Sequence, residues 1–105
     1  MSKQDKAVLG VFAARVRAVF PEARVWGFGS RVRGDAAWDS DFDVCVVLEQ
    51  FDAAVDRILS DIAWEVGFDQ DRVITIIPFS REQFEQGPPS DSSLVRNILK
   101  EGVAA

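Results

Sequence analysis

One uninterrupted apolar segment, residues 42–48, constrains the fold of this chain more than any other feature. Its sequence, FDVCVVL, is rich in β-branched residues, as expected for a strand that is covered on both faces. We therefore expect Phe42–Leu48 to be a central strand of its sheet. The single cysteine of the chain, Cys45, lies in this run and is expected to be a small core residue.

Helical and strand patterns alternate along the rest of the chain. Apolar residues recur at helical spacing over residues 8–20 and again over residues 55–66, where Gly67 is expected to end the second helix. A short strand is predicted at Arg24–Phe28, and another at Val73–Ile77. This order predicts helices packed on a small sheet.

The C-terminal third contains strong stop and cap signals. Pro78 is expected to end the strand Val73–Ile77, and Ser80 with Gln83 three residues later resembles a capping box for a short helix. A last helix is predicted from the apolar residues Leu94, Val95, Ile98 and Leu99, with Gly102 at its end.

The charge balance excludes several functions. With 12 basic and 17 acidic side chains the net charge is −5, which argues against a sequence-blind nucleic-acid coat. The chain has no histidine, so Ser-His-Asp and Cys-His triads and histidine-ligated zinc are excluded. We expect residues 1–105 to form one cytoplasmic domain, because no segment reads as a targeting signal or approaches the ~20 apolar residues that span a membrane.

Two carboxylates stand at the start of the central strand. Asp41 and Asp43 are two residues apart, and the period of a strand places both on one face. Like charges this close repel unless a cation neutralises them, and hard cations such as Mg2+ prefer carboxylate oxygens. A lone Asp-x-Asp is more often a solvated strand end, but here the pair predicts a divalent metal site.

A glycine and a serine follow the preceding strand. Gly29 and Ser30 come directly after Arg24–Phe28, where the start of a short helix would offer backbone N–H groups and a positive dipole end to a phosphate. Gly29 allows close approach of the backbone, the Ser30 hydroxyl adds a donor, and Arg31 or Arg33 can balance the remaining charge. A phosphate cradle followed by a carboxylate metal site supplies the parts needed for metal-assisted nucleotidyl transfer.

At these residues the chain resembles the minimal nucleotidyltransferases of the DNA polymerase beta superfamily. That signature is Gly-Ser, a nearby Arg-Gly, and then Ser-Asp-x-Asp followed by an apolar strand. The matching residues are Gly29, Ser30, Arg33, Gly34, Ser40, Asp41 and Asp43. The resemblance implies an α/β (α+β) fold with a small mixed sheet backed by helices. It also implies that Asp41 and Asp43 are catalytic ligands of one or two Mg2+ ions, and that the nucleotide is bound by Gly29, Ser30, Arg33 and Ser40.

The same resemblance implies a partner. A chain of 105 residues leaves no room for a second-substrate domain, so the acceptor must come from elsewhere. Stand-alone minimal members resemble the antitoxin half of two-gene prokaryotic toxin-antitoxin modules, whose partner is a small helical HEPN-type protein. In those pairs AMP is transferred from ATP to a tyrosine of the partner. The expected function is therefore transfer of NMP from an NTP, ATP above all, to a hydroxyl of a partner protein. The alternative to such a partner is a homo-oligomer of this chain. No membrane or nucleic-acid partner is expected.

One departure concerns a third carboxylate, which active members carry on a later strand. The matching strand, Val73–Ile77, has no acidic residue, and Asp69 and Asp71 just before it are out of phase. The chain can then bind nucleotide and metal without turnover, transfer slowly, borrow a group from its partner or substrate, or be a degenerate relative. The alternative function is a catalytically weak or inactive module that binds and neutralises a partner protein.

Other residues have a structural and a functional interpretation. Trp26 and Trp64 are expected in the core. Arg15 and Arg17 are expected on a solvated helix face, with the lining of a substrate groove as the second interpretation. Trp38 is expected to pack at the domain edge, with stacking on a nucleobase as the second interpretation. Core and partner surface are equally compatible with the apolar residues of the tail: Phe79, Phe84, Leu94, Val95, Ile98 and Leu99.

Overall fold

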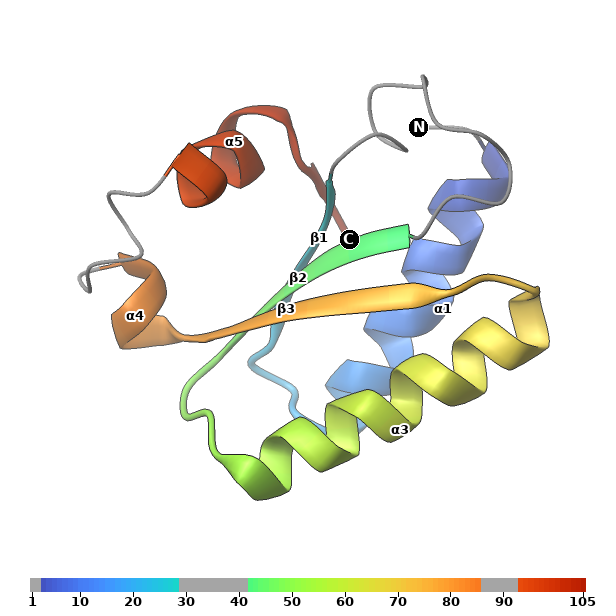
Figure 1. The fold of residues 1–105 in the computed structure, drawn as a ribbon, viewed down its shortest axis with the longest axis horizontal. Helices are drawn as coiled ribbons and strands as arrows, with labels where there is room; N and C mark the ends of the chain where they lie inside the picture. Colours follow the sequence, from blue (N-terminus) through green and yellow to red (C-terminus); the bar gives the residue numbers. More distant parts are fainter. Residues whose placement is uncertain (1–2, 29–41, 86–92) are drawn as a thin grey trace.

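The computed structural model describes residues 3–28, 42–85 and 93–105 of the chain. Figure 1 shows a sheet with helices on both sides. The elements in chain order are α1 (Lys3–Val19), β1 (Arg24–Phe28), β2 (Phe42–Leu48), α3 (Ala53–Gln70), β3 (Ile74–Ser80), α4 (Arg81–Glu85), α5 (Ser93–Glu101) and β4 (Val103–Ala104). The first two predicted strands are confirmed with the bounds that the sequence indicates. The short helix predicted after Ser30 lies outside the described residues.

The described strands form one mixed sheet in the order β3-β2-β1-β4. β2 runs antiparallel to β1 and parallel to β3, and β1 also pairs antiparallel with β4. The strand β2 is therefore central, as its apolar sequence predicts, and every side chain in it except Asp43 is buried. The fold is the mixed α+β arrangement expected from the sequence.

One face of the sheet is covered by α1 and α3 (Figure 1). Val44 and Val46 of β2 point to this face and share a buried cluster with Phe12 of α1 and Leu59 of α3. Phe12 and Leu59 have no exposed surface. The helical stripes seen in the sequence are thus the two surfaces that close this core.

The opposite face is covered by α4 and α5. Because side chains alternate along a strand, Cys45 and Val47 point to this face and form a second buried cluster with Phe84 and Ile98. Cys45 is a buried core residue as predicted, whereas Trp26 is only partly buried and packs against this cluster. The core interpretation also holds for most of the apolar tail, namely Phe79, Phe84, Val95 and Ile98, whereas Leu99 is exposed.

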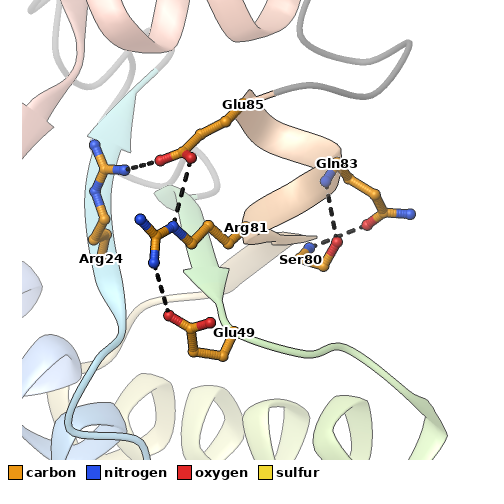
Figure 2. A network of polar contacts seen from close by, with 6 residues as sticks. All are labelled: Arg24, Glu49, Ser80, Arg81, Gln83 and Glu85. Atoms are coloured by element: carbon orange, nitrogen blue, oxygen red, sulfur yellow. Dashed lines mark hydrogen bonds and ion pairs between the residues drawn. The ribbon is translucent and has the colours of Figure 1, made fainter.

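The helix α4 begins with the predicted capping box. The Gln83 N–H donates to the Ser80 hydroxyl oxygen at 3.1 Å, and the Ser80 N–H donates to the Gln83 side-chain oxygen at 3.0 Å. Figure 2 shows this reciprocal pair. It satisfies two backbone donors that the helix start leaves without partners, which explains why so short a helix begins here.

Exposed ion pairs join α4 to the sheet (Figure 2). Arg81 pairs with Glu49 at 3.2 Å and with Glu85 at 3.5 Å, and Arg24 of β1 pairs with Glu85 at 3.2 Å. The Arg24 guanidinium also lies 4.8 Å from the ring centre of Trp26. Surface pairs of this kind contribute at most about 1 kcal/mol each. Burial of Phe84, the one buried side chain of α4, therefore supplies more of the attachment than charge does.

The prediction that Pro78 ends the third strand is wrong. β3 continues to Ser80, and Pro78 is aligned with Val46 in the parallel ladder. The reason is that β3 is an edge strand, where the missing N–H of a proline removes no hydrogen bond that a second neighbour would need. The strand starts at Ile74 rather than Val73.

The prediction that Gly67 ends the second helix is also wrong. α3 runs to Gln70, and Asp71 is its C-terminal cap in the left-handed conformation, with φ 56° and ψ 49°. The N–H groups of Asp71 and Arg72 both turn back to the Gly67 carbonyl. Gly67 is required for a different reason, since a Cβ there would overlap the carbonyl oxygen of Arg72.

Two further expectations are corrected at the surface and the sheet edge. Trp64 is 70% exposed and not a core residue, because it lies on the face of α3 that points away from the sheet. Val19 and Ile58 of the helical stripes are also exposed. No sequence pattern predicted β4, which is only Val103–Ala104 and is held by pairing with β1. In the described ranges no helix is long and apolar enough to cross a membrane.

Candidate functional site

Three strands meet at one end of the sheet and bring three side chains together. Phe28, the last residue of β1, is aligned with Asp43 of β2, and Asp43 is aligned with Thr75 of β3. Aligned residues of neighbouring strands point to the same face, which here is the face covered by α4 and α5. Asp43 is half-buried and Thr75 is exposed. This end of the sheet therefore presents a carboxylate and a hydroxyl group beside the aromatic side chain of Phe28.

The oxygen ligands at this end of the sheet, from Asp43 and Thr75, are of the type that binds a hard cation. A carboxylate and a hydroxyl are both oxygen ligands, which is the type that Mg2+ takes in proteins. Residues 3–28, 42–85 and 93–105 contain no cluster of three or more Asp, Glu or Cys side chains able to hold a metal ion. Of the two predicted metal ligands, Asp43 is the one that lies among the described residues.

Most of the predicted site residues lie outside the described residues: Gly29, Ser30, Arg33, Ser40 and Asp41. Trp38 lies outside them as well. In the chain, Gly29 directly follows Phe28, the last residue of β1, and Asp41 directly precedes Phe42, the first residue of β2.

Neither acidic residue before β3 takes the place of a third carboxylate. Asp69 belongs to α3 and lies 3.5 Å from Arg15 of α1 in an ion pair. Asp71 is the left-handed cap between α3 and β3. The residue of β3 beside Asp43 is Thr75, and β3 has no acidic residue along its whole length. The departure noted in the sequence is confirmed in the described structure.

The two arginines of α1 have structural contacts. Arg15 pairs with Glu65 of α3 at 3.4 Å, which links the two helices. Arg17 donates to the backbone oxygens of Ala23 at 3.1 Å and Ala105 at 2.7 Å, and so ties α1 to the end of the sheet where β1 starts and β4 ends. These contacts favour a scaffolding role over the lining of a substrate groove.

One buried acidic residue near this end of the sheet was not predicted from the sequence. Asp5, in the first turn of α1, is 5% exposed and lies 3.9 Å from the Arg72 side chain in an ion pair. Arg72 comes two residues before β3, so the pair fixes α1 against the start of that strand. A signal was present: Asp5 precedes Val8, Leu9 and Phe12 at helical spacing and therefore lies on the buried stripe.

A family model described as a nucleotidyltransferase domain matches residues 10–105. The chain belongs to this nucleotidyltransferase family. The match covers every element of the domain from within α1 onward and includes the predicted Gly-Ser and Asp-x-Asp motif. No curated protein is similar enough in sequence to be matched.

Two solved structures are similar to the nucleotidyltransferase domain in fold. One is a crystal structure of a toxin-antitoxin with AMP-PNP, with a TM-score of 0.62, 16% identity, and coverage of 98% of this chain and 72% of that chain. The other is an inferred nucleotidyltransferase from Sulfolobus solfataricus, with a TM-score of 0.60, 19% identity, and coverage of 97% and 82%. At these identities the likeness establishes the shared fold.

Proposed function

We propose that this domain transfers a nucleoside monophosphate, AMP from ATP above all, to a hydroxyl group of a partner protein in an Mg2+-dependent reaction. The observation that carries the proposal is the position of Asp43. It stands at the start of the central strand, beside Phe28 and Thr75, where the chain segment with Gly29, Ser30 and Asp41 leaves and rejoins the sheet. Membership of the nucleotidyltransferase family supports this chemistry.

The reaction assigns a role to each motif residue. Asp41 and Asp43 would hold one or two Mg2+ ions, which when bound stabilise the charge that develops around the α-phosphorus and on the leaving pyrophosphate. Gly29 and Ser30 would bind the β- and γ-phosphates. Arg33 would balance their charge, and Ser40 would complete the nucleotide site.

The transfer step is balanced without a further reactant. The acceptor oxygen forms a bond to the α-phosphorus, the bond from that phosphorus to the β-bridging oxygen breaks, and pyrophosphate leaves. The proton of the acceptor hydroxyl passes to a base. Thr75 cannot serve as that base, so the proton would pass to a side chain of the partner or to an oxygen of the departing pyrophosphate.

The partner is proposed to be a small helical protein of the HEPN type, with this domain as the antitoxin. The toxin-antitoxin structure with AMP-PNP supports this part, because it places the same fold in a two-protein system with a nucleotide analogue.

A second function is favoured by one observation. Thr75 stands beside Asp43 where an acid would complete the ligand set, and β3 offers no other. The alternative is a weak or inactive transferase that neutralises its partner by binding alone. Under this alternative, loss of the Asp43 carboxylate leaves neutralisation unchanged.

Calorimetric titration with ATP and Mg2+, followed by pyrophosphate release with and without the protein of the neighbouring gene, tests the proposal. Asp43→Asn should lower metal-dependent transfer about a hundredfold or more, since even outer-shell changes at metal sites cost about 10–100-fold. Asp56→Asn, an exposed acid of α3, is the matched control and should leave the rate unchanged.

Thr75→Asp separates the two functions. It places a second carboxylate beside Asp43 and should raise the transfer rate if the missing acid is what limits the domain. The added carboxylate should also lower stability without Mg2+ and recover it with Mg2+, because the two like charges repel. Pyrophosphate release that is absent from both the unmodified domain and Thr75→Asp would refute the transferase and leave the binding module.

A further inference from the structure

The outer face of α3 carries two large exposed aromatic side chains. Trp64 is 70% exposed and Phe68 is 75% exposed. They lie one helical turn apart, and their rings are stacked with centroids 5.5 Å apart and planes 12° from parallel. The buried residues of α3 are on its opposite face: Leu59, Ile62, Ala63, Val66 and Gly67. The core of the domain therefore makes no use of this aromatic pair.

The same helix, together with its two capping residues, has a local excess of negative charge. Between Asp52 and Asp71 there are six acidic side chains and one basic one, Arg57, a local net charge of −5 that equals the net charge of the whole chain. Two of the acidic residues, Glu65 and Asp69, form ion pairs with Arg15. Within the described part of the chain no cation pairs with Asp61, which lies one turn before Trp64 on the same face.

These two observations select the chemistry of an occupant. Exposed aromatic side chains that pack against one another are typical of a surface that another protein covers, because aromatic residues dominate the binding energy of interfaces. A guanidinium or ammonium group can stack on an indole ring and at the same time pair with a neighbouring carboxylate. A second copy of this chain would bring a like-charged helix to the same face and be repelled.

We propose that the outer face of α3, centred on Trp64, Phe68 and Asp61, is a docking surface for a basic amphipathic segment of a partner protein. Apolar side chains of that segment cover the aromatic pair, and its arginine or lysine side chains meet the surrounding carboxylates. Docking here needs neither nucleotide nor metal. It therefore stands beside the proposed function and can fail or succeed independently of nucleotidyl transfer.

The probe is a synthetic amphipathic helical peptide of leucine and arginine. Its charge control is the same peptide with glutamate at every arginine position. Binding is measured by fluorescence anisotropy without ATP or Mg2+. The basic peptide should bind, more weakly as salt rises. Trp64→Ser/Phe68→Ser should raise its Kd about tenfold or more, and Asp61→Lys should also raise it.

Leu99→Ser is the matched control, because Leu99 is 56% exposed but belongs to α5. Its Kd should equal that of the unmodified domain. Thermal melting of the double variant should match the unmodified domain, since neither aromatic side chain is buried. Equal binding of both peptides, or an unchanged Kd in the double variant, would overturn the proposal. Self-association in sedimentation equilibrium that the double variant abolishes would also overturn it, in favour of a second copy as the occupant.

Discussion

Replacing Gly67 by alanine tests the turn that connects α3 to the strand beside Asp43. The Arg72 N–H donates to the Gly67 carbonyl at 2.8 Å, and this turn brings the Arg72 carbonyl oxygen against the Cα of Gly67. An added Cβ would lie closer to that oxygen than real Cβ atoms come, and the oxygen belongs to the main chain. The turn must therefore shift to accept the methyl group.

Gly10 provides the matched control, because it is also inside a helix but a Cβ there has no atom within 4 Å. In both positions alanine gains about 1 kcal/mol of helix propensity over glycine. At Gly67 the overlap costs roughly 1–3 kcal/mol, and we expect the upper part of this range because the turn is tight. Gly10→Ala should therefore stabilise by about 1 kcal/mol, and Gly67→Ala should destabilise by about 1–2 kcal/mol.

Urea unfolding followed by far-UV circular dichroism measures both variants. The two urea midpoints should move in opposite directions. In thermal unfolding, the difference of about 2–3 kcal/mol between the variants should separate their Tm values by roughly 8–24 °C, since about 1 kcal/mol shifts the Tm of a domain of this size by about 4–8 °C. An equal increase in stability for both variants would refute the argument from the turn. A shifted turn should also move Thr75 relative to Asp43, so Gly67→Ala should weaken Mg2+-dependent ATP binding whereas Gly10→Ala should not.

Two further predictions concern a helix cap and the buried thiol. Asp52→Ala removes the acceptor for the Val55 N–H, a 2.9 Å hydrogen bond, and should cost about 1 kcal/mol in urea unfolding, whereas Asp52→Asn should keep most of that stability; equal losses would contradict the capping role. Burial raises the pKa of Cys45 from 9.0 to about 12, with a smaller opposing effect of Arg24. The folded state therefore holds this proton more tightly than the unfolded state, and the stability it contributes is complete below pH 9 and lost as pH rises toward 12. Between those values the free energy of unfolding should fall more steeply with pH in the unmodified domain than in Cys45→Ala, by about 1 kcal/mol per pH unit, and parallel curves would contradict this.

Local patterns were sufficient for several elements. β1 and β2 have the predicted bounds, the Ser80–Gln83 box starts α4, and Gly102 follows the end of α5, with its N–H bonded to the Ile98 carbonyl at 2.8 Å. These features depend on neighbours within a few residues, so the sequence contains the interactions that form them. The Gly-Ser and Asp-x-Asp spacing was equally local, and it was enough to indicate the family.

The tertiary structure decided those features that depend on contacts between residues far apart in the sequence. The sequence by itself determined which segments form the longer helices and the first three strands, that the Phe42–Leu48 segment is central, and that carboxylates stand at its start. Only the assembled sheet decided that Pro78 is tolerated, because β3 has one neighbour among the described strands. It also decided that Thr75 is the residue beside Asp43, because parallel register is set by packing. Packing also decided that Trp64 faces away from the core, since the side of α3 that the sheet covers was already filled by smaller apolar residues.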